Sequence, residues 1–348
     1  MKRLNVHILY EYGVNMRPHA SASLRLLRPF SHPLVRKEVD ATFGFDLTDS
    51  TPDLVLVDRL WRPNIQPHMV DELVEKVHRK GAKLIYWFDD NFLGLEGRKS
   101  IPPGFVESFR RFLEVSDGFV VSTLVLFKEF SNLRKTVFLP SALDERIIVR
   151  KLEKKPDPRK ITIGYMGSST HDEDLRMVLP ALREVNALHP GRLRFQFVGA
   201  LNEEKLKSWK DLAQMPVEIL QPSPEESEYQ LFMLWFTGTV RWDFAIAPLM
   251  DNWFNRFKSD IKFLDYTAAA APGIFSSVAP YAATIETRKT GLVIENSREN
   301  WVSAMEELIE NNTLRSALIH NAVDHLYEER ILSKCAGNWV KALHEVME

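Results

Sequence analysis

Residues 258–272 combine side chains that suit the binding of an anion at the start of a helix. Lys258 precedes Ser259, an expected N-cap, and Pro272 ends the Ala-rich helical segment that follows. An anion there would meet both the ammonium group and the positive end of the helix dipole. Asp265 lies in the middle of this segment among small and apolar residues, so its carboxylate needs a partner. The alternative is an ordinary helix that follows a surface turn.

A second anion-binding turn is expected at residues 167–174, directly after an apolar run. Thr170 and Glu173 have the spacing of a capping box, which predicts a helix start. Small and hydroxylated residues at a helix start are typical of a phosphate site, and the candidates here are Gly167, Ser168, Ser169 and His171. The Gly-Lys-Ser/Thr ending of a P-loop is missing. His171 could equally be a capped surface histidine.

Residues 12–25 form a third candidate region, which we expect to bind an acceptor or a phosphate. Its small residues would let a ligand approach the backbone, and its arginines suit phosphate or carboxylate groups. The candidate residues are Gly13, Arg17, His19, Ser21 and Arg25. No G-x-G-x-x-G is present, so a dinucleotide fingerprint is not supported. The alternative is a solvated loop before an N-capped helix.

Asp89 and Asp90 follow the apolar run 82–88. Carboxylates at a strand end can orient a hydroxyl nucleophile, take up its proton or bind a cation. The alternative is that they cap the next turn.

Apolar runs that alternate with helical patterns predict the elements that carry these residues. Strands are expected at 4–10, 53–58, 82–88, 117–122, 136–139, 161–166, 193–198, 217–220, 244–247, 274–277 and 292–294. Helices are expected near 68–80, 103–115, 124–132, 171–188, 225–238, 260–270, 298–309, 312–327 and 331–347. This alternation predicts an α/β fold with doubly wound parallel sheets, in which ligands meet the loops after the carboxyl ends of the strands.

The charged, Pro-containing segment 150–160 reads as a linker between two domains. We expect an N-terminal domain at 1–155 and a C-terminal domain at 156–328. Residues 329–348 are expected to form a helix that packs back on the N-terminal domain. Two such domains predict a ligand-binding cleft between them.

Composition excludes several classes of protein. The 348 residues are 45% hydrophobic and 26% charged, which is typical of globular proteins. A net charge of −2 gives no general attraction to nucleic acid. The single cysteine, Cys335, excludes an internal disulfide and a cysteine-built zinc site. Because no signal peptide or membrane-spanning run is evident, we expect a cytoplasmic protein.

Several segments together resemble a known family. They are Ile-Gly-Tyr-Met-Gly-Ser-Ser-Thr-His-Asp at 163–172, Ala-Pro-Leu at 247–249, Asn-Arg-Phe-Lys-Ser-Asp-Ile-Lys-Phe-Leu-Asp-Tyr at 255–266, Pro-Tyr at 280–281 and Gly-Leu-Val-Ile at 291–294. They are similar to nucleotide-sugar-dependent glycosyltransferases of the GT-B type, nearest to the family 4-like enzymes of bacterial surface polysaccharide assembly. The resemblance is strongest over 160–325. It implies two Rossmann-like domains that face a cleft, the first on the acceptor side and the second binding the nucleotide sugar.

The resemblance also implies roles for single residues. Asp265, seven residues before Pro272, matches the carboxylate that grips the ribose of the donor. The family's earlier glutamate falls on Phe257, which shifts polar contacts toward Lys258 and Ser259. The cationic role at the diphosphate is then expected of Lys258, together with Arg256.

We therefore expect a glycosyltransferase that moves a sugar from a nucleotide diphosphate sugar to a hydroxyl group of a glycan or lipid-linked acceptor. Lys258 would stabilise the leaving diphosphate and Asp89 or Asp90 would take the acceptor proton. The reaction is expected to be retaining and to need neither a metal nor another cofactor. The alternatives are an inactive sugar-nucleotide-binding or scaffold subunit of a glycan assembly complex, and a sugar-nucleotide epimerase.

Residues 17–37 suggest a peripheral membrane contact as a further possibility. Five cations lie there among Leu, Phe and Pro: Arg17, Arg25, Arg28, Arg36 and Lys37. A basic, partly apolar edge could touch anionic headgroups near a lipid-linked acceptor. The alternative is a solvated helix face.

Overall fold

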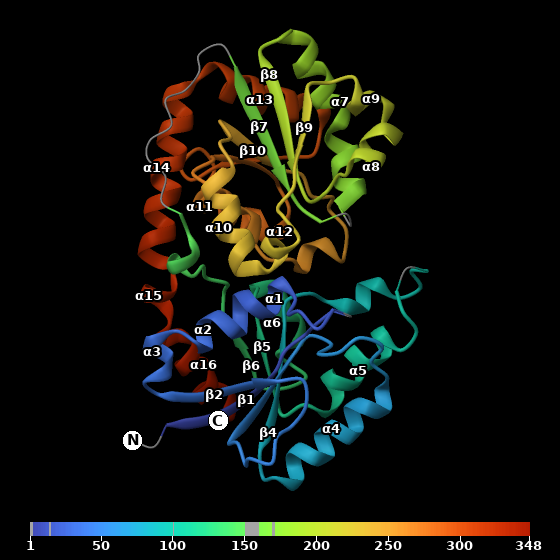
Figure 1. Ribbon diagram of the computed structural model, residues 1–348, viewed down its shortest axis with the longest axis vertical. Helices are drawn as coiled ribbons and strands as arrows, with labels where there is room; N and C mark the ends of the chain where they lie inside the picture. Colours follow the sequence, from blue (N-terminus) through green and yellow to red (C-terminus); the bar gives the residue numbers. More distant parts are fainter. Residues whose placement is uncertain (1–2, 14, 100, 150–159, 169–170) are drawn as a thin grey trace.

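The structure is a computed structural model that describes residues 3–13, 15–99, 101–149, 160–168 and 171–348. Two six-stranded parallel sheets, each covered by helices, lie one above the other in Figure 1. This arrangement confirms the prediction of two doubly wound α/β domains. The expected boundary between residues 155 and 156 lies outside the described residues.

The N-terminal sheet has the strand order β2-β1-β3-β4-β5-β6. Its strands are β1 (Leu4–Leu9), β2 (Val39–Gly44), β3 (Leu54–Asp58), β4 (Lys83–Phe88), β5 (Gly118–Val121) and β6 (Thr136–Phe138). The flanking helical elements are α1 (Ala20–Ala22), the π-helix η1 (Ser23–Leu27), α2 (Arg28–Phe30), α3 (Pro33–Arg36), α4 (Pro67–Arg79), η2 (Phe92–Leu95), α5 (Phe105–Val115), α6 (Leu124–Phe130) and η3 (Glu145–Ile147). The strand order changes direction between β1 and β3, which places a ligand crevice above these two strands.

The C-terminal sheet has the order β12-β11-β10-β7-β8-β9. Its strands are β7 (Ile161–Met166), β8 (Leu193–Val198), β9 (Val217–Leu220), β10 (Phe244–Ala247), β11 (Gly273–Ser276) and β12 (Leu292–Ile294). The helical elements are α7 (Asp172–Leu188), α8 (Glu203–Ser208), α9 (Lys210–Ala213), η5 (Glu225–Ser227), α10 (Tyr229–Thr239), η6 (Asn255–Phe257), α11 (Ile261–Ala268), α12 (Ala279–Ala282), α13 (Arg298–Glu310) and α14 (Asn312–Glu329). Here the direction changes between β7 and β10, and the loops after these strands lead toward the other domain.

The chain returns to the N-terminal domain at its end. From α14 it passes through α15 (Leu332–Cys335) to α16 (Gly337–Met347), which packs against β5 and β6 (Figure 1). Trp339 of α16 is buried, and its indole Nε1 donates a hydrogen bond to the carbonyl oxygen of Arg25 at 2.8 Å. Where the chain crosses over, Arg330 donates to Ser141 O and to both carboxylate oxygens of Asp260.

Burial on both faces explains why most strands were predictable. β3 reads Leu-Val-Leu-Val-Asp and all its residues are buried, as expected for a parallel strand covered by helices on both sides. α4 buries Val70, Leu73, Val74 and Val77, which recur with helical spacing.

The sequence analysis missed β2 and the short helical elements at 20–36, together with α8, α9 and α12. β2 is an edge strand that alternates buried residues with more accessible ones, such as Asp40 and Thr42, so it lacks a continuous apolar run. Most of the missed helices have only three to six residues, too few to show a period of 3.6. In the described part of the chain, no helix is long and apolar enough to cross a bilayer.

Candidate active site

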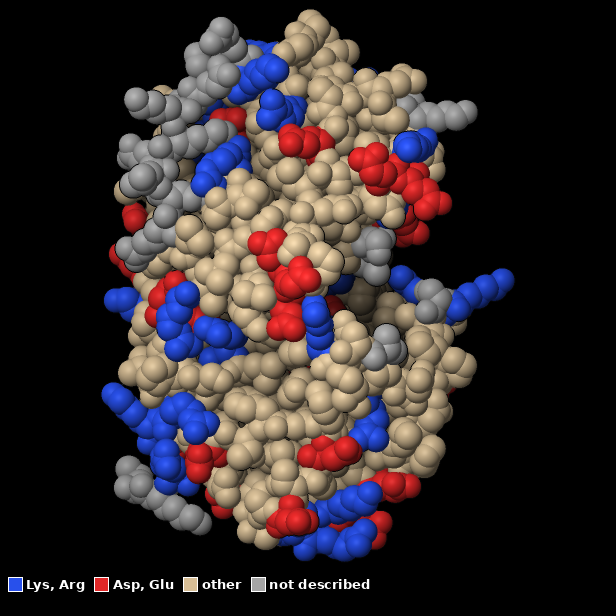
Figure 2. All heavy atoms as spheres, viewed as in Figure 1, with Lys and Arg blue, Asp and Glu red and all other residues tan. Residues whose placement is uncertain are grey.

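A cavity of about 280 Å³ lies between the two domains, where the carboxyl ends of both sheets meet. Figure 2 shows a hollow between the two lobes of the molecule. The cavity is lined from both domains, and it gathers eight of the residues that the sequence predicted: Ser21, Arg25, Asp89, Asp90, His171, Lys258, Ser259 and Asp265. These residues lie up to 244 positions apart in the chain, so only the fold brings them together.

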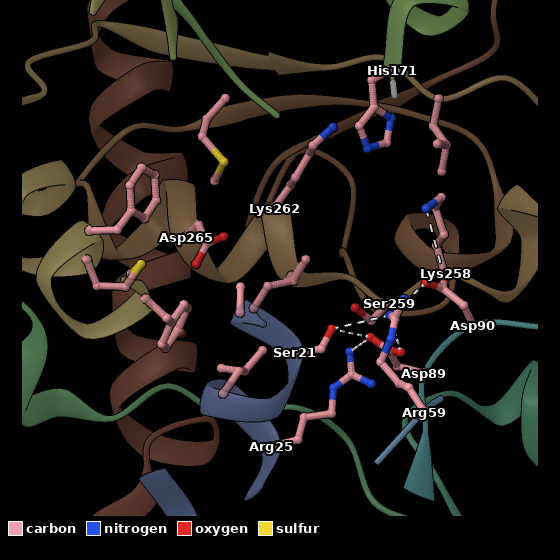
Figure 3. A pocket seen from close by; sticks show the side chains of 18 of the residues that line it. Ser21, Arg25, Arg59, Asp89, Asp90, His171, Lys258, Ser259, Lys262 and Asp265 are labelled. Carbon is pink, nitrogen blue, oxygen red and sulfur yellow. Dashed lines mark hydrogen bonds and ion pairs between the residues drawn. The ribbon is translucent and has the colours of Figure 1, made fainter. Parts of the chain in front are cut away.

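The N-terminal wall of the cavity is built around Asp89, which follows β4. Its carboxylate accepts hydrogen bonds from Ser21 Oγ at 2.8 Å, from Arg59 Nη1 at 2.7 Å and from Arg25 Nη2 (Figure 3). Arg25 comes from the π-helix η1, an element that occurs often at functional sites. Burial and then the nearby charge of Arg59 lower the pKa of Arg25 to about 10.

Arg59, which follows β3, connects three carboxylates. Its Nε lies 2.6 Å from Glu11 Oε2, and its Nη1 contacts both Asp89 and Asp90. Arg59 also has a φ of 49°, a left-handed conformation that is uncommon for residues other than glycine. A residue held in such a conformation by several ion pairs has a fixed side-chain direction.

Asp90 joins the two walls of the cavity. Its Oδ2 accepts from Arg59 Nη1 at 3.1 Å, and its Oδ1 lies 3.9 Å from Lys258 Nζ. Burial raises the pKa of Asp90, but the positive charges of Lys258, Arg59 and Arg25 outweigh it and hold the pKa below its usual value. A carboxylate with a lowered pKa is a weak base, so this geometry favours Asp90 as an anchor for cations over the expected proton acceptor.

The C-terminal wall is carried by α11, but the helix starts later than expected. Asp260 is its N-cap residue, and Ser259 lines the cavity without capping the helix. Lys262, in the first turn, reaches the cavity and donates a hydrogen bond to Tyr165 Oη at 3.3 Å. Burial and the charge of Lys258 lower the pKa of Lys262 to about 8, against the opposing effect of Asp174.

Lys262 is a buried cation that forms no ion pair with any described residue. Its side chain is only 6% exposed, and its ammonium lies 4.9 Å from the centre of the Tyr165 ring. Burying a charge without a partner costs several kcal/mol. An anionic ligand in the cavity would supply the missing partner.

Asp265 lies one turn further along α11, in the apolar half of the cavity (Figure 3). Apolar side chains of both domains surround this half, among them Leu24, Phe232 and Met233. Burial raises the pKa of Asp265 to about 8, although the positive charge of Lys262 opposes this effect. Its Oδ1 has no hydrogen-bond partner in the described structure, and neither has Tyr229 Oη. A ligand that enters here can therefore hydrogen-bond to both groups.

His171 sits at the start of α7, close to Lys262 (Figure 3). Its Nδ1 lies 2.7 Å from Asp174 Oδ2, while Asp174 Oδ1 accepts from the backbone N–H of Met250 at 2.7 Å. Burial lowers the pKa of His171, so the ring is neutral at pH 7. A neutral ring that donates from Nδ1 to a carboxylate presents Nε2 as an acceptor.

Three further candidate residues do not line this cavity: Gly167, Ser168 and Arg256. A side chain at position 167 would meet Tyr165 Oη at 2.6 Å, so Gly167 leaves room for that tyrosine. Arg256 is exposed and forms a bidentate ion pair with Asp251, which directs its charge away from the cavity. Ser169 lies outside the described residues.

The three remaining candidates, Gly13, Arg17 and His19, line a second cavity of about 350 Å³. Arg17 crosses to the C-terminal domain and donates to Pro224 O at 3.0 Å and to Ser227 Oγ at 3.3 Å. His19 Nδ1 lies 3.4 Å from Glu11 Oε2, the atom that also contacts Arg59. Glu11 thus contacts one residue of each cavity, His19 of the second and Arg59 of the first.

The five cations of residues 17–37 do not form one surface. Arg25 is buried at the main cavity and Arg28 forms an ion pair with Asp144. Arg36 and Lys37 are exposed near Leu34. Of the basic, partly apolar edge expected at residues 17–37, Arg36, Lys37 and Leu34 therefore form a small exposed patch.

Lys262 and Arg59 line the cavity but were not predicted as site residues from the sequence. Lys262 stands three residues before Asp265, so helical spacing places both on one face of α11. Lys262 could therefore have been predicted from the sequence, since it shares a helix face with the candidate Asp265. Arg59 had no comparable signal beyond its place directly after an apolar strand.

No protein-family model matches this sequence, and no curated protein matches it either. Solved structures do match its fold. HepE from Anabaena, in complex with UDP and glucose, has a TM-score of 0.66 at 9% identity, over 99% of this chain and 100% of HepE. Sucrose-phosphate synthase from Thermosynechococcus elongatus has a TM-score of 0.65 at 9% identity, over 99% of each chain.

TarM of S. aureus matches with a TM-score of 0.61 at 12% identity, over 85% of this chain. The chain spans only 55% of the length of TarM. At such identities the likeness establishes the fold, which is the GT-B arrangement of two Rossmann-like domains.

Proposed function

We propose that the protein transfers a sugar from a nucleotide diphosphate sugar to a hydroxyl acceptor. The observation that carries the proposal is Lys262, a buried ammonium group at the wall of the interdomain cavity that has no ion pair among the described residues. Lys258 lines the same cavity, so a diphosphate would find two cations there. The GT-B fold of the chain is consistent with this chemistry.

In the proposed reaction, the bond between the sugar C1 and the diphosphate oxygen breaks while the acceptor oxygen bonds to C1. Lys262 and Lys258 stabilise the negative charge that develops on the departing diphosphate. A preorganised charged donor of this kind is worth on the order of 3 kcal/mol of barrier. The proposed reaction therefore needs no metal ion, and it proceeds with retention as in the family 4-like enzymes that the sequence resembles.

The proton of the acceptor hydroxyl has two available routes. Asp89 and Asp90 lie in the cavity, but both already accept from arginines. We therefore assign the proton to an oxygen of the departing diphosphate, while the two aspartates hold Arg25, Arg59 and Lys258 in place.

The nucleoside occupies the apolar half of the cavity in this proposal. Asp265 Oδ1 and Tyr229 Oη, both without a partner in the described structure, receive the ribose hydroxyls. The acceptor, a glycan or a lipid-linked glycan, approaches through the second cavity beside Arg17 and His19.

A second candidate function is nucleotide-sugar binding without transfer, within a glycan assembly complex. It is favoured by the ion pairs of Asp89 and Asp90, which neutralise Arg25 and Arg59 within the protein itself. Product analysis after incubation with radiolabelled UDP-sugars and a glycan acceptor separates the functions. Transfer gives a labelled glycan, an epimerase gives a changed sugar still linked to UDP, and a binding subunit leaves the donor unchanged.

A further inference from the structure

Phe257 belongs to the C-terminal domain, but its side chain lies in the hydrophobic core of the N-terminal domain. It follows β10 in the 3-10 turn η6 and is only 3% exposed. All other buried members of its hydrophobic cluster come from residues 9–130, including Trp61, Phe92 and Leu126. Thr123 Oγ1 also donates to the carbonyl oxygen of Phe257 at 3.3 Å. The turn is therefore anchored in the opposite domain.

Gly94 makes room for this anchor. A β-carbon at position 94 would lie 2.7 Å from Cε3 of Trp253 and 3.2 Å from Cβ of Phe254. Real β-carbons do not approach other atoms to 2.7 Å, so the turn can dock this closely only against a residue without a side chain. Trp253 in turn contacts the Phe257 ring, at 5.0 Å between ring centres.

Leu24 makes the opposite exchange. It belongs to the N-terminal π-helix η1 and is 5% exposed, but it lies in a hydrophobic cluster that the C-terminal domain mainly forms, with Met233 and Phe263. Leu143, Ile147 and Ile148 of the N-terminal domain belong to the same cluster. Each exchanged residue stands directly before a cation of the main cavity. Leu24 precedes Arg25, and Phe257 precedes Lys258.

We infer that Leu24 and Phe257 are positioning residues that interlock the two domains through their own side chains. The interlock holds Arg25, which pairs with Asp89, and Lys258, which lies 3.9 Å from Asp90, on facing walls of the cavity. Opening the cleft requires Phe257 to leave one core and Leu24 to leave the other. We therefore expect the release of this interlock to limit how fast a ligand enters, which lowers its association rate.

The test uses Gly94→Ala, which pushes Trp253 and Phe254 away without leaving a cavity in either core, and Phe257→Ala, which removes the anchor itself. Phe257→Leu keeps an apolar anchor and serves as the conservative variant. Gly337→Ala is the matched control, because a β-carbon at position 337 meets no atom of the described residues within 4 Å. Small-angle X-ray scattering of the ligand-free proteins measures the radius of gyration, and stopped-flow mixing with UDP measures the rates of binding and release.

We expect Gly94→Ala and Phe257→Ala to have a larger radius of gyration than the wild type and Gly337→Ala. Both should bind UDP about tenfold faster and release it faster still, whereas Phe257→Leu should stay close to the wild type. A merely structural role would not accelerate association. An unchanged radius of gyration in Gly94→Ala, or UDP association no faster than in the wild type, would overturn the inference. The kinetic measurement rests on the proposed function. If UDP does not bind the wild type at all, the proposed function is refuted. The radius of gyration then decides by itself whether the two residues interlock the domains.

Discussion

Replacing Lys262 with methionine should stabilise the ligand-free protein and weaken nucleotide binding at the same time. Burial lowers the pKa of Lys262 from 10.5 to about 8, so the folded state disfavours the charged form. Each pH unit of that difference corresponds to ~1.4 kcal/mol, which gives a cost of about 3 kcal/mol at pH 7. Methionine keeps most of the aliphatic stem and removes the charge.

The sign of the pH dependence follows from the same pKa values. Because the folded pKa lies below the unfolded one, the cost of Lys262 is full below pH 8 and disappears as the pH rises toward 10.5. The gain in the free energy of unfolding from Lys262→Met should therefore fall from about 3 kcal/mol at pH 7 to about 2 kcal/mol at pH 9. Urea denaturation at both pH values measures it.

Binding should change in the opposite direction. A hydrogen bond to a charged group is worth about 1.5–3 kcal/mol, so the affinity for UDP should fall roughly 10- to 100-fold. Isothermal titration calorimetry measures this loss. Lys289→Met is the matched control, since Lys289 is exposed and pairs with Glu286. This control variant should change neither the free energy of unfolding nor the affinity for UDP. A Lys262→Met protein that is less stable than the wild type and binds UDP equally well would refute the reasoning.

Three further predictions concern other residues of the two cavities. Burial raises the pKa of Asp265 from 3.8 to about 8, so the stability of the wild type should decline as the pH rises between these values. Asp265→Asn should remove that decline in urea denaturation and lower UDP affinity by about tenfold; an unaltered pH profile would contradict the assignment. Lys258→Ala should reduce turnover by roughly a hundredfold with a nearly unchanged melting temperature, and wild-type turnover would exclude its role at the leaving group. Arg17→Ala should raise the KM for the acceptor while the affinity for the donor nucleotide stays the same; equal losses for both would place Arg17 elsewhere.

The sequence predicted all strands of the C-terminal sheet. β10 and β11 are buried throughout and read as short apolar runs, whereas β8 alternates apolar and polar residues. The edge strand β2 was missed, since Asp40 and Thr42 interrupt its pattern. The final helix lies on the N-terminal sheet, and the linker that precedes β7 falls partly outside the described residues.

Most single residues of the candidate site could be predicted from the sequence, but the ion pairs between them could not. The sequence pointed to Lys258 and Asp265, whereas the ion pair to Asp90 leaves Lys262 as the less neutralised cation. Asp89 looked like a free carboxylate at a strand end, but Arg25 and Arg59 reach it from positions 64 and 30 residues earlier in the chain. Contacts between residues so far apart in the chain leave no local pattern in the sequence. In the sequence, Phe257 stands where the family that the chain resembles has a glutamate. Only the fold shows that the side chain of Phe257 packs in the core of the other domain.

The most direct test of the central claim is a thermal-shift experiment with UDP, GDP, dTDP and CMP, on the wild type and on Lys262→Met. A ligand that binds only the folded state stabilises it by about 2.7 kcal/mol at a concentration 100 times its Kd. The proposed function predicts that at least one of the nucleotides raises the melting temperature of the wild type and that Lys262→Met loses most of this increase. The absence of any shift with all four nucleotides, or an equal shift in the variant, would contradict it.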